Sequence, residues 1–203
     1  MSSPTLRERK RNRTRQALID AGVELFERNG YDGTTVADIA EAADIGTRTF
    51  FGYFASKDEL LFPDSARRVD VAITAIANRG PDDRPADVLL RALSDVAAPV
   101  GQPDDMLDRL ARLRLRLIRT VPAVRGRALQ VQVDAQRAIA THLARAYADE
   151  LDDVTAAALV GAFVGAINGA LMVLLADDEA ADDPEHVRQR LRDATDVALR
   201  PWR

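Results

Sequence analysis

The chain has 203 residues, of which 47% are apolar and 30% are charged, with a formal net charge of -4 and no cysteine. This composition is typical of a folded globular protein and excludes an intrinsically disordered one. The lack of cysteine also excludes disulfides and thiolate chemistry.

The first fifteen residues are basic, although the protein as a whole is acidic. Glu8 is the one acidic residue among six basic ones, which are Arg7, Arg9, Lys10, Arg11, Arg13 and Arg15. Such an arm can face nucleic-acid phosphates while the remaining surface stays acidic, but a solvated, frayed terminus carries the same charges. The segment has no apolar stretch of the kind found in secretory signals, so we expect a cytoplasmic protein.

Two helices are predicted after this arm. Apolar residues recur at helical spacing over Arg13 to Arg28, and Asn29-Gly30 offers a stop for that helix. A second helix is predicted to begin at Thr35, because Thr35 and Asp38 have the spacing of a capping box.

The next segment completes a helix-turn-helix pattern over about residues 35–54. A break over residues 42–45 leads to Gly46, which permits a turn, and a helix is predicted from Thr47 to Phe54 with Phe50 and Phe54 facing the core. Ser56 is the predicted cap of the helix that follows. The second helix of such a motif enters the DNA major groove through its N-terminal residues.

Individual side chains in this motif suit contacts with DNA. Arg48 can donate two hydrogen bonds to guanine, and Thr47 offers a hydroxyl and a methyl group that suits thymine. Thr49, Tyr53 and Lys57 follow where hydroxyls and an ammonium group can reach phosphates.

The remainder is predicted to be helical too, with Pro- and Gly-containing breaks and no alternating strand pattern. The fold class is therefore all-α, with about nine helices. Arginines recur on one helix face (Arg109, Arg112, Arg116 and Arg119), beside leucines on an adjacent face (Leu110, Leu113 and Leu117). These faces suit an amphiphile with a polyanionic head, but a solvated face beside a core stripe has the same pattern.

One segment needs a test for membrane insertion. Thr155 to Ala176 has 22 residues and no charge, and Gly161, Gly165 and Gly169 follow small-xxx-small spacing. Acidic residues flank it on both sides, without the Lys and Arg clusters that orient a membrane span. We therefore expect no membrane partner and a helix buried against protein on all sides.

The segment from Arg13 to Leu61 resembles the N-terminal DNA-binding domain of TetR/AcrR-type transcriptional regulators. The resemblance lies in a helix ending in Gly-Tyr, a Thr-Thr helix start, an Ile-Ala pair, Thr-Phe-Phe-x-Tyr-Phe and Ser-Lys-x-Glu-Leu. It implies a DNA-binding domain over residues 11–60 and a helical ligand-binding and dimerisation domain over residues 61–200. It also implies a bacterial homodimer that binds a palindromic double-stranded DNA operator, usually as a repressor, and releases it when a small effector binds.

Carried over by residue, the resemblance makes Thr47 and Arg48 base readers. The other DNA-binding positions that it implies are Arg13, Thr35, Gly46, Thr49, Tyr53 and Lys57. This sequence departs from the family at Gly46, where a capping serine is usual, and at Gly52, which costs roughly 1 kcal/mol of helix propensity.

The segment from Arg112 to Leu129, in a helical region that reaches Tyr147, is similar to a subgroup of this family with an acyl-CoA-like ligand domain. The effector implied is an acyl-CoA or another lipid-like molecule, bound by Arg109, Arg112, Leu113, Arg116, Leu117, Phe163 and Ile167. The uncharged helix and the helix over Val187 to Leu199 are the implied dimerisation face, with Gly161, Gly165, Gly169 and Leu191 in the contact.

An enzyme is the principal alternative class, and the residues do not favour it. The two histidines, His142 and His186, lie far apart in sequence, and no nucleophile elbow or phosphate-binding loop occurs. We therefore expect no catalytic residues, no metal and no cofactor. A helical module that binds only proteins is the other alternative, and loss of DNA binding on substitution of Arg48 distinguishes it from a regulator.

Overall fold

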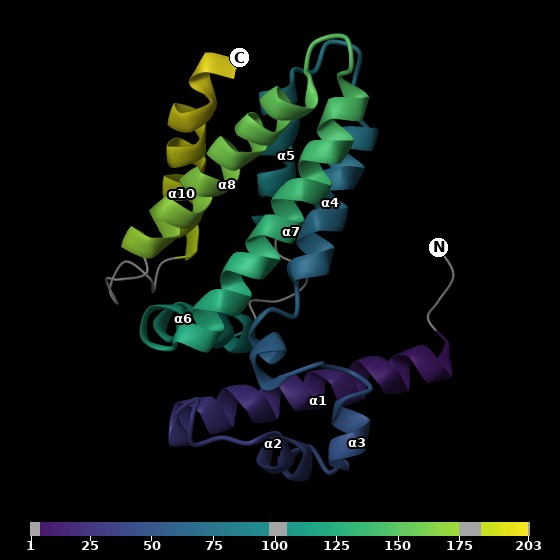
Figure 1. Cartoon of the computed structure of the whole chain (residues 1–203), viewed down its shortest axis with the longest axis vertical. Helices are drawn as coiled ribbons and strands as arrows, with labels where there is room; N and C mark the ends of the chain where they lie inside the picture. Colours follow the sequence, from purple (N-terminus) through teal and green to yellow (C-terminus); the bar gives the residue numbers. More distant parts are fainter. Residues whose placement is uncertain (1–4, 98–104, 175–183, 203) are drawn as a thin grey trace. The chain divides into compact units, whose positions relative to one another are not determined.

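A computed structural model describes residues 5–97, 105–174 and 184–202. In these ranges the chain forms nine α-helices, two 3₁₀ turns and no strand, so the all-α prediction is confirmed (Figure 1). The elements are α1 (Leu6–Asn29), α2 (Val36–Ala42), α3 (Thr47–Phe50), η1 (Lys57–Leu61), α4 (Ser65–Ala77), α5 (Pro85–Ala97), α6 (Asp105–Thr120), α7 (Pro122–Ala146), α8 (Asp153–Leu174), α10 (Pro184–Leu199) and η2 (Arg200–Trp202).

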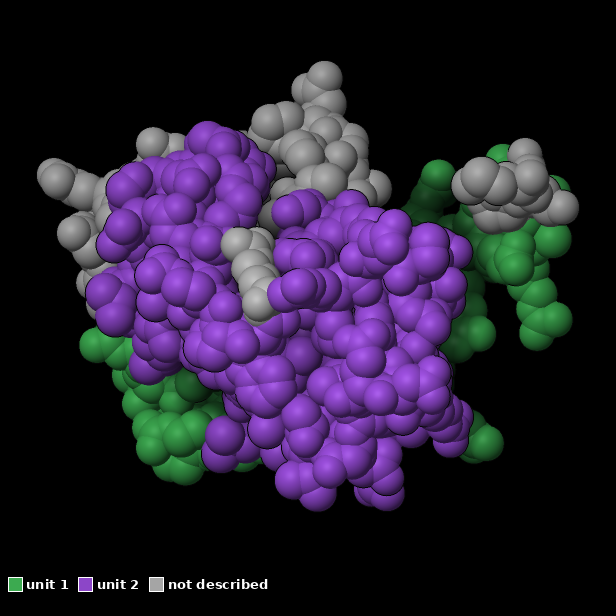
Figure 2. Space-filling model, turned by 90° about the horizontal axis from the view of Figure 1, so that it is seen from above, with its two compact units in different colours: residues 1–63, 104–128 green, residues 64–103, 129–203 purple. Residues whose placement is uncertain are grey.

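Two compact units make up the chain, and the first is discontinuous in sequence (Figure 2). It contains residues 1–63 and 104–128, whereas the second contains residues 64–103 and 129–203. The first unit therefore includes α6, which follows the second unit's α4 and α5 in the chain.

The core of the first unit explains why α6 belongs to it. The buried face of α1, which includes Leu18 and Phe26, shares one apolar cluster with Phe50 and Phe54 as expected from their spacing. The leucine stripe of α6 completes this cluster, with Leu113 only 2% exposed. Apolar area is removed from water on both helices by this contact, which is the main source of their mutual stabilisation.

The second unit has its own core, built from α4, α5, α7, α8 and α10. Its cluster includes Leu89, Leu143, Leu159 and Leu199, none of which is exposed to solvent. The only tryptophan of the chain, Trp202, is partly buried against this cluster.

The uncharged helix α8 is not buried on all sides in a single chain, so that expectation is wrong. Ala156, Leu159, Val160 and Phe163 are buried, but only 17% of its most apolar window is. With a mean hydropathy of 2.1 it is long and apolar enough to cross a membrane by length and composition. One chain supplies neighbours for only one face of α8, which leaves Val173 73% exposed.

Candidate nucleic-acid interface

The turn between α1 and α2 is held by side chains at both of its ends. Helix α1 ends at Gly30, whose φ of 75° is a conformation that favours glycine. The Thr34 hydroxyl is fully buried and lies 2.8 Å from the Gly30 carbonyl oxygen, to which it donates. Thr34 thus satisfies backbone acceptors at the end of α1 that would otherwise be unpaired.

The predicted capping box at the start of α2 is confirmed. The Asp38 amide donates to the Thr35 hydroxyl oxygen at 3.2 Å, and the Thr35 amide donates to the Asp38 carboxylate at 2.8 Å. Hydrogen bonds from the Thr35 backbone and then its side chain hold the pKa of Asp38 below its usual value. Because the Thr35 hydroxyl also donates to Asp38, its one O–H donor is already engaged.

The break between α2 and α3 contains a non-glycine residue with positive φ. Asp44 adopts φ 54°, and the Ile45 amide donates to the Ala40 carbonyl at 2.9 Å across the turn. Aspartate tolerates this left-handed region better than most residues, at some cost relative to glycine. Gly46 then caps α3 without a side-chain hydrogen bond, as its lack of a hydroxyl requires.

The short helix α3 has polar side chains exposed to solvent and one side chain buried in the core. Thr47, Arg48 and Thr49 are exposed, whereas Phe50 is completely buried. The α-helix ends at Phe50, earlier than predicted, and the Gly52 amide bonds to the Thr49 carbonyl in a tighter turn. Phe50 therefore anchors the helix while the side chains before it remain available to a ligand.

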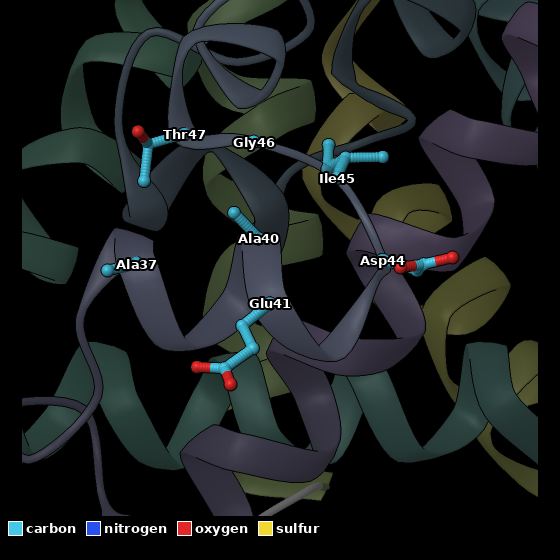
Figure 3. A pocket seen from close by; sticks show the side chains of 7 residues that line it. All are labelled: Ala37, Ala40, Glu41, Asp44, Ile45, Gly46 and Thr47. Atoms are coloured by element: carbon cyan, nitrogen blue, oxygen red, sulfur yellow. The ribbon is translucent and has the colours of Figure 1, made fainter.

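An open hollow of about 540 Å³ lies between α2 and α3 (Figure 3). Three of its lining residues, Ala37, Ala40 and Gly46, have small side chains or none, which leaves the hollow open. Ala37 and Thr47 lie at one end in Figure 3 and Asp44 at the other. The carboxylates of Glu41 and Asp44 repel phosphate, so a nucleic acid is favoured at the end with Thr47.

Lys57 is engaged with the protein itself rather than extended into solvent. Its ammonium group donates to the Tyr31 carbonyl at 2.6 Å and to the Thr34 carbonyl at 2.8 Å, and it lies 4.1 Å from the centre of the Tyr31 ring. Burial, then Asp58 and Asp32, raise the pKa of Tyr31 to about 12, so its phenol stays neutral at physiological pH. The ammonium group thereby ties η1 to the turn that leads into α2.

Tyr53, Arg13 and the predicted cap Ser56 differ in burial and in hydrogen bonding. Tyr53 is half-buried against the core of the first unit. Arg13 is exposed on α1, nine residues before the buried Gly22, which places it about 180° around the helix from the core face. Ser56 precedes a 3₁₀ turn and makes no side-chain capping bond, so the prediction that it caps a helix is wrong.

The predicted ligand residues are divided between the two units. On α6, Arg109 forms an ion pair with Glu27 of α1, Leu113 and Leu117 are buried in the first core, and Arg112 and Arg116 are exposed. This is the arrangement of an exposed arginine face beside a core stripe. Phe163 and Ile167 instead belong to the core of the second unit.

The predicted dimer residues lie on the part of α8 and α10 that the single chain leaves open. Gly165 and Gly169 are exposed, Gly161 and Leu191 are half-buried, and a Cβ added at any of the three glycines would meet nothing within 4 Å. Within the described ranges, no group of three or more His, Asp or Glu side chains could hold a metal ion.

Several contacts that shape the interface were not predicted from the sequence. Arg127 pairs with Glu59 at 2.9 Å, Arg114 donates to the Leu61 carbonyl at 3.3 Å, and Arg15 donates to the Pro63 carbonyl at 3.2 Å. These bonds join residues far apart in sequence, so no local pattern marks them. They fix η1 and the segment after it against α1, α6 and α7.

Comparisons with known families match both units. Residues 18–62 match the family model for bacterial regulatory proteins of the tetR family, and residues 83–198 match the model for the MftR C-terminal domain. The first match spans the whole helix-turn-helix. Together the two models leave residues 1–17, 63–82 and 199–203 unmatched.

Individual relatives agree with these families. The transcriptional regulator TcmR of Streptomyces glaucescens is 31% identical over 154 residues, which cover 75% of this chain and 68% of TcmR. The putative mycofactocin biosynthesis regulator MftR of Mycobacterium tuberculosis is 41% identical over 56 residues, 28% of each chain. The fold matches Thermus thermophilus FadR, a TetR-family repressor solved with lauroyl-CoA, with a TM-score of 0.54 and 21% identity over 89% of this chain and 92% of FadR.

Proposed function

Because the chain belongs to the TetR family of bacterial regulatory proteins, it is a DNA-binding transcriptional regulator and not an enzyme, and we propose that it is a cytoplasmic, homodimeric repressor. In this proposal it occupies a palindromic operator and releases it when a small amphiphilic effector binds. One observation carries the assignment of the DNA-reading surface: Arg48 is exposed, whereas Phe50, two residues later on the same short helix, is fully buried.

We assign Thr47 and Arg48 to base edges in the major groove. Both lie in the first turn of α3, where no side chain caps the helix and Gly46 leaves space for close approach of DNA. Thr49 and Tyr53 supply hydroxyls for phosphates on the flanking backbone. Thr35 and Lys57 act mainly by holding α2 in place, since their donors are largely engaged within the protein.

Selection of bound sequences from random DNA tests this assignment. We expect a palindromic consensus, and we expect Arg48→Ala to lose about 10- to 100-fold in affinity, since a bidentate base contact discriminates by about 1–3 kcal/mol. Arg119→Ala, at an exposed arginine on α6, is the matched control and should retain wild-type affinity. Failure of the wild-type protein to enrich any sequence, or equal binding by both variants, would contradict the proposal.

The apolar surface that α8 and α10 expose in a single chain supports a homodimer. Val154, Met172 and Val173 on α8 and Val197 on α10 are between 45% and 78% exposed in one chain. Large exposed apolar side chains on neighbouring helices are costly in water and are typical of interaction surfaces. A second copy of the chain would cover them by a two-fold contact of the same helices.

We propose that the effector is an acyl-CoA or a similar lipid-like molecule and that its apolar part binds in the second unit. The lauroyl-CoA complex of FadR, whose fold this chain shares, supports this class. Phe163 and Ile167 supply apolar surface on α8. The next residue along α8, Asn168, donates to Gln132 of α7 at 2.8 Å, which places a polar pair beside that surface.

Titration with acyl-CoAs of different chain length tests the effector. Trp202 reports on the second unit because it packs against the same core, so we expect saturable quenching together with release of operator DNA. Free coenzyme A controls for the head group. Ile167→Ala should weaken both responses about 10- to 60-fold, because it removes three carbons that contribute up to about 0.8 kcal/mol each when buried. The effector class is refuted if acyl-CoAs change neither Trp202 fluorescence nor operator affinity.

A further inference from the structure

The N-terminal turns of α1 extend beyond the core of the first unit. The first buried residue of the helix is Leu18, yet the helix begins at Leu6, so about three turns precede the first buried residue. Figure 1 shows these turns, in dark purple, running past α3. Their exposed side chains include Arg7, Arg9, Lys10, Arg11 and Arg13.

This extension is an ordered, capped helix. The Glu8 amide donates to the Thr5 hydroxyl oxygen at 3.2 Å, and the Thr5 amide donates to the Glu8 carboxylate at 2.7 Å. Glu8, the one acidic side chain of the arm, is thereby held at the helix start, and its pKa lies below the usual value because of these bonds from Thr5. A capped helix holds its cations in defined directions, unlike a frayed terminus.

The cations of the extension lie on two different faces of α1. Arg7, Arg11 and Arg15 are spaced by four residues and share one face. Arg15 shows where this face points, because its guanidinium lies 4.9 Å from the centre of the Phe54 ring, just after α3. Arg9 and Arg13 lie on the other side, about 160–200° around the helix from Arg11.

We propose that Arg7 and Arg11 bind DNA phosphates that flank the bases read by α3 and so lengthen the operator. This inference rests on the proposed function. The Cα atoms of Arg11 and Arg7 lie about 6 and 12 Å along the helix axis from that of Arg15, at 1.5 Å per residue, which corresponds to about two and four base pairs of duplex. The recognition helix and the extension together then contact a longer stretch of backbone than α3 alone.

The experiment compares two double variants that remove the same charge from the same helix. Arg7→Gln with Arg11→Gln alters the face that continues from Arg15, whereas Arg9→Gln with Lys10→Gln removes two cations that lie at least about 100° around the helix from Arg11. Glutamine keeps the helix propensity close to that of arginine, so both variants should retain the extension. Fluorescence anisotropy with the selected operator, over a salt series, gives the affinity and the number of phosphates neutralised.

We expect the Arg7/Arg11 variant to lower the slope of log affinity against log salt by about 1.8 per protomer, at 0.9 per phosphate. We expect the Arg9/Lys10 variant to keep nearly the wild-type slope. On a duplex shortened by four base pairs at each end, wild type and the Arg7/Arg11 variant should bind alike. That result ties the lost contacts to flanking DNA.

Equal losses in both double variants would overturn the proposal, because the arm would then act only through its total charge. Unchanged slopes in both variants, with Arg48→Ala still defective, would overturn it as well while leaving the proposed function intact. If Arg48→Ala binds like wild type, the proposed function itself fails, and that outcome is distinguishable from the other two.

Discussion

Replacement of Lys57 by methionine separates two roles for one ammonium group. The family resemblance makes Lys57 a phosphate contact, whereas the structure engages it with the Tyr31 and Thr34 carbonyls and the Tyr31 ring. Hydrogen bonds that involve a charged group contribute about 1.5–3 kcal/mol each, and a cation–π contact about 0.5–2 kcal/mol. The lower limits of these ranges sum to about 3.5 kcal/mol. Since Lys57 is half-buried, solvent screening reduces this sum, and we expect Lys57→Met to destabilise the turn by about 2–3 kcal/mol.

Hydrogen exchange localises this effect, because the two units need not unfold together. A loss of 2 kcal/mol raises the exchange rate about 30-fold, at 1.36 kcal/mol per factor of ten, and we expect this in the amides of residues 31–42. Lys10→Met is the matched control, since Lys10 is the only other lysine and is exposed on the first turns of α1. If Lys57→Met weakens DNA binding while exchange in this segment stays at the wild-type rate, the ammonium group binds phosphate and does not stabilise the turn.

Three further substitutions test separate features. Asp44→Gly should stabilise the first unit by up to about 1 kcal/mol, because glycine adopts φ 54° without the steric cost of a Cβ. Urea denaturation measures this change, and an unchanged or lower midpoint would count against this reasoning. Gly165→Leu should raise the dimer dissociation constant at least tenfold in sedimentation equilibrium, because the larger side chain overpacks the contact. Gly126→Leu, at another helical glycine with open space around it, should leave the dissociation constant unchanged. A monomeric wild-type protein refutes the dimer. Asp38→Ala should destabilise α2 at pH 7. The folded-state pKa of Asp38 lies below 3.8, so its contribution to stability is complete above that pH and is lost as the pH falls through the folded-state pKa. The difference in hydrogen-exchange rate between variant and wild type in α2 should therefore shrink towards pH 3. A difference that stays constant with pH would argue against the capping role.

Local signals in the sequence account for the helix-turn-helix. The Thr35 capping box and Gly30 determine where α1 ends and α2 begins, and both act through residues at most three positions apart. The start of α1 was placed too late because the prediction followed apolar periodicity, which begins only near Leu18. The Thr5 to Glu8 spacing is itself a capping box and would have located the helix start.

Contacts between distant segments could not be predicted in this way. Arg109 and Glu27 are 82 positions apart, and the leucines of α6 have the same pattern whether they bind a ligand or complete a core. Only the folded chain shows that they pack with Leu18 and Phe26. The ends of α3 and the setting of Lys57 likewise depend on tertiary contacts that single-sequence patterns do not contain.

The discontinuous first unit limits how this regulator can be divided. A fragment that stops at Pro63 keeps every residue of the helix-turn-helix but loses Leu110, Leu113 and Leu117, which fill its core from the other side. Such a fragment would expose apolar surface on α1 and lose the partner of Glu27. A chimaera that transplants this DNA specificity onto another sensor therefore has to carry residues 104–128 as well, although they lie some forty positions farther along the chain.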